Sequence, residues 1–153
     1  METLERVLSE HPFLQGLDRK HVEFLTGCAR NVRFEAGEFL HREGDDGNVI
    51  YLLRHGRVAL EVHVPDKGTL QVDSLGEGEV LGWSWLFPPH RWQLDARAVE
   101  PVLALALDGA CVRQKMDADH DFGYALTKRL LYQIYQRLGR VRLQRLDVYK
   151  TDA

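Results

Sequence analysis

Between residues 28 and 107, short apolar runs alternate with turns rich in glycine, and this alternation restricts the fold more than any other feature. The run Asn48–Arg54 is mostly apolar, and after His55 and Gly56 the run Arg57–Val64 alternates apolar and polar side chains with a period of two. A turn at residues 65–68 leads into another alternating run. Short strands joined at this spacing predict an antiparallel sandwich or barrel.

Helical patterns flank the predicted strands on both sides. The first 27 residues predict two short helices, because Pro12 disfavours helix at His11. Asp108 is expected to cap a further helix, and a long amphipathic helix is predicted from about residue 121 to residue 149. The prediction is therefore an α+β fold in one domain, 1–153, with N-terminal helices (1–27), an antiparallel β-roll or jelly roll (28–107) and C-terminal helices (108–153).

Composition and charge argue against several classes of protein. The net charge of −3 does not suggest a nucleic-acid-binding surface, which is usually strongly basic. No run approaches the ~20 apolar residues of a membrane span, and no signal peptide is recognisable, so we expect a cytoplasmic protein without membrane contact. Cys28 and Cys111 match no metal-binding spacing and are expected to be buried thiols, with a disulfide or redox switch as the alternative. No catalytic, metal-binding or nucleotide-loop motif appears, so we expect neither a metal nor enzyme activity.

Three segments, in this order and spacing, carry a resemblance to a known family. They are FEAGEFL followed by REGD at residues 34–45, YLLRHGRV at residues 51–58, and LGEGEVLG at residues 75–82. These segments resemble the cyclic-nucleotide-binding domain family, whose fold is shared by the catabolite activator protein, kinase regulatory subunits and cyclic-nucleotide-gated channels. The resemblance covers essentially the whole chain.

The resemblance implies that the residues after Gly82 form the phosphate-binding cassette, in which a short helix follows the glycine and its N-terminal amides face the cyclic phosphate. In the family, a glutamate just after this glycine binds the ribose hydroxyl, and an arginine about ten residues later pairs with the cyclic phosphate. Here Trp83 replaces the glutamate, and the arginine position holds Arg91 or Trp92. An indole N–H can only donate, and losing a charged hydrogen-bond partner typically costs ~1.5–3 kcal/mol. We therefore expect a site damaged for cyclic AMP and cyclic GMP.

The cassette nevertheless supplies the candidate ligand-binding residues, namely Gly82, Trp83, Ser84, Trp85, Arg91 and Trp92. The aromatic side chains could fill the pocket, dock a protein partner or stack on a bound base. Arg91 and the amides after Gly82 could still hold an anion. No cofactor is certain, and the alternatives are a cyclic nucleotide, a nicotinamide nucleotide, another phosphate ester or no ligand.

The long helix is the second candidate surface. In relatives it pairs with its own copy, and here it carries apolar residues at steps of four and three. The predicted dimer or partner seam is Leu130, Ile134, Leu138 and Val141. The family's transcription factors continue from this helix into a helix-turn-helix, and nothing comparable follows in this sequence, so we expect no DNA-binding domain.

Two functions fit these observations. The first is a non-catalytic regulatory or accessory subunit with a protein partner, a homodimer or both. Stand-alone domains with a cassette like Gly-Trp-Ser-Trp at residues 82–85 resemble the small accessory subunit of soluble NAD-reducing nickel-iron hydrogenases, so a redox enzyme is one expected partner. The second is a small-molecule sensor that binds a cyclic nucleotide or another phosphate-containing nucleotide.

Overall fold

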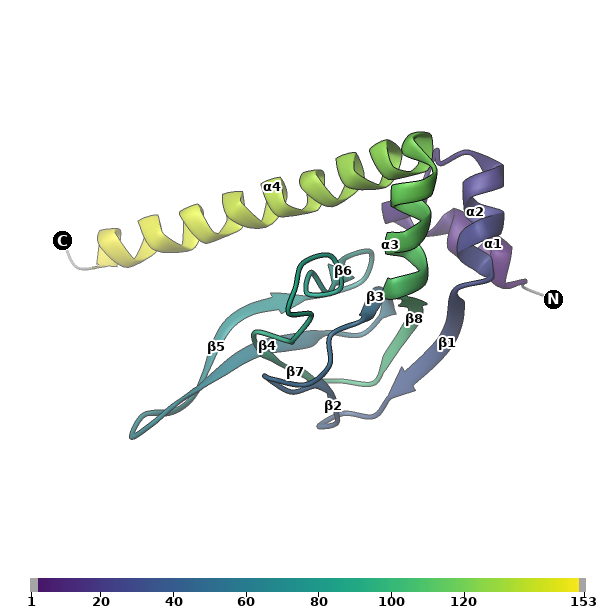
Figure 1. The fold of residues 1–153 in the computed structure, drawn as a ribbon. Helices are drawn as coiled ribbons and strands as arrows, with labels where there is room; N and C mark the ends of the chain where they lie inside the picture. Colours follow the sequence, from purple (N-terminus) through teal and green to yellow (C-terminus); the bar gives the residue numbers. More distant parts are fainter. Residues whose placement is uncertain (1–2, 152–153) are drawn as a thin grey trace.

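The computed structural model describes the backbone of residues 3–151 and the side chains of residues 3–143. Two four-stranded antiparallel sheets form the β-roll, with strand orders β1-β8-β3-β6 and β2-β7-β4-β5. The short helices lie at one end of the roll, and the long helix α4 runs from there across the sheets (Figure 1). This arrangement confirms the predicted α+β β-roll with short N-terminal helices and a long C-terminal helix. The strands are β1 Ala29–Phe34, β2 Phe39–His41, β3 Val49–His55, β4 Val58–Val64, β5 Gly68–Leu75, β6 Val80–Leu81, β7 Asp95–Ala98 and β8 Val102–Asp108.

Strand β3 lacks polar alternation over most of its length because both of its faces are buried. Ile50 and Leu52 pack in a core shared with the helices, whereas Tyr51 and Leu53 pack in a second core with β4 and β7. A strand buried on both faces reads as a continuous apolar run. Its connection to β4 requires Gly56, which has φ of +92° and whose position leaves no room for a Cβ beside the carbonyl oxygen of Pro101.

The helices begin and end close to the predicted positions. They are α1 Leu4–Glu10, the 3-10 helix η1 Pro12–Leu14, α2 Arg19–Thr26, α3 Gly109–Ala118 and α4 His120–Thr151. Asp108 caps α3 as predicted, since its Oδ1 accepts hydrogen bonds from the backbone N–H groups of Ala110 and Cys111 at 3.0 and 3.2 Å. None of the described helices is both long and apolar enough to cross a membrane.

The N-terminal segment is fastened to the β-roll by a buried histidine. His11 Nδ1 accepts a hydrogen bond from the backbone N–H of Phe13 at 3.2 Å, so the proton lies on Nε2 and is donated to Leu53 O at 2.9 Å. Burial lowers the pKa of His11, which keeps the ring neutral. Both ring nitrogens are thus used in holding η1 against β3.

Candidate functional site

The cassette after Gly82 forms a single turn in place of the short helix that the family resemblance implies. The backbone N–H of Leu86 donates to Trp83 O at 3.1 Å, and no regular helix follows. Gly82 has φ of +120°, and a Cβ there would lie 2.8 Å from Val49 O and 3.0 Å from the Trp92 ring. Only glycine fits this close approach, so the cassette keeps the family's turn but not its helix.

A small pocket lies between the cassette and α4. Its volume is about 80 Å³, well below the ~300–1,000 Å³ typical of ligand pockets, so a nucleotide does not fit in this conformation. Four of the predicted ligand-binding residues line it, whereas Trp85 and Arg91 do not. The lining is His41, Leu60, Leu81, Gly82, Trp83, Ser84, Trp92, Gln93, Leu94 and Arg137.

Trp92 occupies much of the space that the fold leaves beneath the cassette. Its ring stacks on His41 with centroids 3.5 Å apart and an interplanar angle of 4°. Trp92 and His41 are each only 6% exposed, and Tyr51 continues the stack with its centroid 6.4 Å from Trp92. The chain therefore fills its own pocket with an aromatic pair, one of the alternatives left open above.

His41 is the pocket residue that sequence reasoning missed. Both ring nitrogens are buried, and neither makes a hydrogen bond of good geometry in the described part of the chain; the backbone of Leu94 is close enough to act on the ring but is not aligned for such a bond. Burial lowers the pKa of His41 to about 4, so the ring is neutral near pH 7 and can donate one hydrogen bond and accept another. A buried polar group without a partner is uncommon and calls for an explanation. In the sequence, His41 was one of several isolated histidines with no ligand spacing.

Trp85 belongs to the core and not to the pocket. It is fully buried among the residues that join the sheets to the helices. Its Nε1–H donates to Gly82 O at 2.9 Å, and its own carbonyl oxygen accepts a hydrogen bond from Arg113 of α3. These contacts hold the cassette turn against the helices, so Trp85 is a structural residue here.

The guanidinium at the pocket comes from α4 and not from the cassette. Arg91 is exposed, its Nη1 lies 3.4 Å from Gly44 O, and it is not part of the pocket lining. Arg137 lines the pocket, and its Nε and Nη2 lie 3.3 and 3.2 Å from Asp73 Oδ2 on β5. Arg137 was not among the predicted site residues, because only the tertiary structure brings α4 over β5.

A second arginine joins this ion-pair cluster. Arg140 Nη2 lies 3.6 Å from Asp73 Oδ2, and its Nη1 bonds Glu79 Oε1. Glu79 also accepts a hydrogen bond from the backbone N–H of Gly76 at 2.7 Å through its other oxygen. Together these contacts fasten α4 to β5 and to the turn that leads into β6. We call Asp73, Glu79, Arg137 and Arg140 the α4 clasp.

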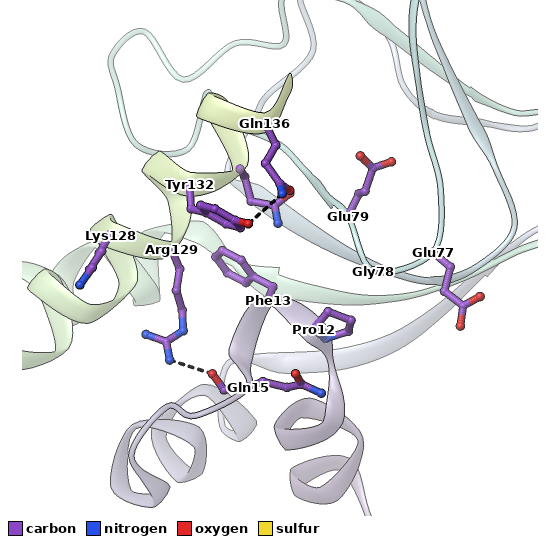
Figure 2. Close-up of a pocket in the computed structure, with 11 residues that line it drawn as sticks. Pro12, Phe13, Gln15, Glu77, Gly78, Glu79, Lys128, Arg129, Tyr132 and Gln136 are labelled. Carbon is purple, nitrogen blue, oxygen red and sulfur yellow. Dashed lines mark hydrogen bonds between the residues drawn. The ribbon is translucent and has the colours of Figure 1, made fainter. Parts of the chain in front are cut away.

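A larger hollow of about 670 Å³ lies on the other side of Glu79, between η1 and α4 (Figure 2). Arg129 bridges its two walls by donating to Gln15 O at 2.9 Å, and Gln136 donates to the Tyr132 hydroxyl at 2.9 Å. This groove shares no lining residue with the cassette pocket. It holds no buried polar side chain without a partner among the described residues. The smaller pocket therefore remains the candidate ligand site.

The outer face of α4 is an exposed apolar stripe. Leu131, Ile134, Leu138 and Val141 follow one another at steps of three and four, and are between 46% and 64% exposed. Leu130 corrects the predicted seam, because it is only 3% exposed and packs with Phe122 and Leu126 in the chain's own core. Leu131 takes its place in the exposed stripe, one residue later and about 100° further around the helix.

The two cysteines lie close together where β1 begins and α3 starts. Neither forms a disulfide, and both are half-buried. Burial, together with a side-chain hydrogen bond to Cys111, raises the pKa of Cys28 to about 12. A thiol with so high a pKa is a poor nucleophile at neutral pH. The prediction of buried thiols is met only in part, because both cysteines are half-buried.

Comparison with known proteins identifies the family. Residues 31–119 match the family model described as the cyclic nucleotide-binding domain. A CRP-like cAMP-activated global transcriptional regulator from Mycobacterium tuberculosis is 24% identical over 149 residues, covering 97% of this chain and 65% of the regulator. A cAMP-dependent protein kinase regulatory subunit from Schizosaccharomyces pombe is 32% identical over 78 residues, covering 51% of this chain and 18% of the subunit. The chain thus spans no more than about two thirds of these curated relatives.

A solved structure shows the same fold over the full length of its own chain. A protein from Geobacter metallireducens, described as cyclic nucleotide-binding, superimposes with a TM-score of 0.78 at 23% identity, covering 90% of this chain and 99% of that one. The match of the family model covers more than half of the 153 residues. The chain belongs to the cyclic nucleotide-binding domain family.

Proposed function

We propose that this chain is a non-catalytic regulatory or accessory subunit that acts through protein contacts made by the outer face of α4. The observation that carries the proposal is the contrast between a pocket filled by Trp92 and a helix stripe left exposed. Apolar side chains at heptad-like spacing pack well against another helix, and contiguous exposed apolar patches mark interaction sites. The regulatory roles named for the two curated relatives support a role of this class.

The first partner we propose is a second copy of the chain. A two-fold dimer pairs the same patch on both copies, so one apolar stripe is sufficient to form it. Sedimentation analysis of the purified protein should show a dimer, and Leu138→Glu should shift it to a monomer. Val99→Glu is the matched control, because Val99 is also an exposed apolar residue but lies after β7, away from α4. A wild-type protein that stays monomeric at high micromolar concentration would rule out this partner.

The second partner we propose is a redox enzyme. The support is the resemblance of residues 82–85 to the cassette of the small accessory subunit of soluble NAD-reducing hydrogenases. The test is co-purification of the chain with such a hydrogenase, using wild type, Leu138→Glu and Val99→Glu. Co-elution that only Leu138→Glu abolishes would support this partner, whereas a hydrogenase that elutes without the wild-type chain would exclude it.

A second candidate function is that of a small-molecule sensor, and it is favoured by the buried nitrogens of His41, which make no hydrogen bond of good geometry among the described residues. A bound ligand could supply the hydrogen bonds that this buried ring lacks. Thermal unfolding in the presence of cyclic AMP, cyclic GMP, cyclic dinucleotides, NADH or NADPH tests the nucleotide form of this function. A ligand at ~100 times its Kd should stabilise the fold by ~2.7 kcal/mol, which corresponds to roughly 5–10 °C. An unchanged Tm with all of them would contradict it.

A further inference from the structure

We propose that Arg137 of α4, and not Arg91 of the cassette, pairs with the anionic group of a ligand in this pocket. The ligand class is a compact anion, of one ring or less, that carries a carboxylate or a phosphate. The inference rests on the sensor function proposed above and names the residues and the ligand class that this function would use.

The position of the two arginines is the first argument. Arg137 lines the pocket, whereas Arg91 lies outside it with its guanidinium near Gly44 O. A guanidinium meets a carboxylate or a phosphate with two parallel N–H donors. Arg137 already holds one carboxylate, although not in the two-oxygen geometry, since Nε donates to Asp73 Oδ2 at 3.3 Å and Nη2 lies 3.2 Å from the same oxygen. The side chain is therefore oriented for anion binding before a ligand arrives.

His41 provides the second, independent argument. Its buried ring lines the same pocket as Arg137, and neither nitrogen makes a hydrogen bond of good geometry with a described residue, although the backbone of Leu94 lies near enough to raise the pKa of the ring slightly. A neutral imidazole offers one donor and one acceptor, so it suits a polar atom carried by the ligand next to its anionic group. The Arg137 guanidinium and the neutral His41 ring line the same small cavity. Together they indicate a ligand that carries an anionic group and, next to it, a polar atom.

In the structure, the Asp73 carboxylate contacts the Arg137 guanidinium, which is the group that the ligand's anion would bind. An entering anion must therefore take Arg137 away from Asp73. This exchange does not leave the carboxylate without a cation, because Arg140 Nη2 lies 3.6 Å from the same Asp73 oxygen. Arg140 also retains its contact with Glu79. Because Arg140 stays beside Asp73, the α4 clasp can release Arg137 to a ligand without leaving the Asp73 carboxylate unpaired.

Size and lining restrict the ligand further. The cavity of about 80 Å³ is walled by Leu60, Leu81 and the aromatic rings of Trp83 and Trp92. Such a wall favours a compact, flat and mostly apolar body. A whole cyclic nucleotide would require Trp92 to leave its stack on His41. A one-ring anion is also larger than the cavity as it stands, but besides the exchange at Arg137 it requires a smaller displacement of the lining than a nucleotide does.

The exchange would also connect the pocket with the outer face of α4. Arg137 and Leu138 are neighbours in sequence, and successive residues of an α-helix point about 100° apart. One therefore faces the pocket and the other the exposed stripe. Loosening of the Arg137–Asp73 contact would change how α4 lies on β5, and with it the position of the docking stripe.

The test measures binding of four probes by isothermal titration calorimetry at low ionic strength. The probes are benzoate, phenyl phosphate, inorganic phosphate and cyclic AMP. The variants are Arg137→Met, Asp73→Asn and, as the matched control, Arg91→Met, each checked for folding by circular dichroism. We expect wild type to bind benzoate or phenyl phosphate more tightly than inorganic phosphate or cyclic AMP. The stronger of the two one-ring probes then distinguishes a carboxylate ligand from a phosphate ester.

The variants have opposite expected effects. Arg137→Met should weaken binding roughly tenfold or more, because a charge-assisted hydrogen-bond pair is lost. Arg91→Met should change the Kd by less than about twofold, since surface charges outside a site contribute little. Asp73→Asn should tighten binding several-fold because it removes the competing carboxylate. A merely structural role for Asp73 would instead predict weaker binding or none.

Three results would overturn the inference. They are loss of binding in Arg91→Met but not in Arg137→Met, weaker binding by a folded Asp73→Asn variant, and the absence of binding of any probe by wild type and by Asp73→Asn. The sedimentation assay separates this failure from failure of the accessory function. If Leu138→Glu still disrupts assembly while no probe binds, only the ligand inference falls.

Discussion

The cassette pocket and the outer face of α4 are built from similar apolar side chains, but the chain covers the first and leaves the second open. In the pocket, Trp92 stacks on His41 and both are almost fully buried. On α4, Leu138 and its neighbours in the stripe expose about half of their surface. The pocket is thus largely closed by the chain's own side chains, whereas the helix stripe is accessible to a partner.

The two regions are physically connected through α4. The α4 clasp holds the inner side of the helix over β5, beside the pocket, and the same turns carry the exposed stripe on the outer side. A helix fastened by ion pairs can be released more readily than one fastened by a large apolar core, because charge pairs exchange partners with ligands and water. Four predictions test the contrast between the two regions, beginning with the largest expected effect.

Trp92→Ala should have the largest effect on stability. Truncation of a buried tryptophan leaves a cavity and typically lowers the free energy of unfolding by about 3–5 kcal/mol. Urea unfolding of wild type and variant measures the change. Trp92→Phe is the control, because it keeps a ring against His41 and should lose less. A decrease below about 1 kcal/mol for Trp92→Ala would mean that the pocket is not part of the core.

His41 should make the fold sensitive to mild acid. The pKa of His41 is lowered from 6.5 to about 4 by burial, so between these values the unfolded chain binds a proton that the folded chain does not. The stability that the neutral ring contributes is therefore present above about pH 6.5, and up to about 3 kcal/mol of it is lost as the pH falls to 4.

The measurement is urea unfolding at several pH values between about 7 and 4.5. His41→Phe keeps an aromatic stack on Trp92 but removes the titrating group, so its stability should fall less steeply with acid. His11, whose pKa is also lowered by burial, contributes in the same direction in both proteins. Equal slopes for wild type and His41→Phe would show that His41 is not buried as a neutral ring.

Asp73→Asn should have an intermediate effect on the unliganded protein. It removes the carboxylate shared by Arg137 and Arg140, whose side chains are 19% and 40% exposed. The energetic contribution of a partly buried ion pair lies between that of an exposed pair and that of a buried pair. We therefore expect the free energy of unfolding to fall by about 1–3 kcal/mol. Urea unfolding again measures it. Asp66→Asn in the exposed turn before β5 is the matched control and should be nearly neutral.

Leu138→Ala should have the smallest effect on the folding of the single chain. Substitutions at exposed positions usually change stability by less than about 0.5 kcal/mol. Leu130→Ala, on the inner side of the same helix, should cost about 2–5 kcal/mol because Leu130 is buried. Unfolding at protein concentrations low enough to dissociate any dimer compares the two. A large loss for Leu138→Ala under these conditions would mean that the stripe packs within the chain.

Much of the fold could be predicted from local patterns. The alternating runs and glycine turns identified the strands of the β-roll, and Asp108 marked the start of α3, because periodicity and capping depend on neighbours in sequence. The predicted contact surface on the long helix was less accurate. Its periodicity could not distinguish Leu130 from Leu131, since adjacent helix positions differ in burial only through what packs against them.

The candidate site was likewise predictable from the sequence only in part. The sequence by itself placed the start of the cassette at Gly82 and showed that Trp83 replaces the ribose-binding glutamate that the family resemblance implies. Only the tertiary structure decided that Trp92 would close the pocket on His41 and that α4 would bring Arg137 to it. These contacts join residues far apart in sequence, and their geometry depends on how the helices and sheets pack, which no local pattern records.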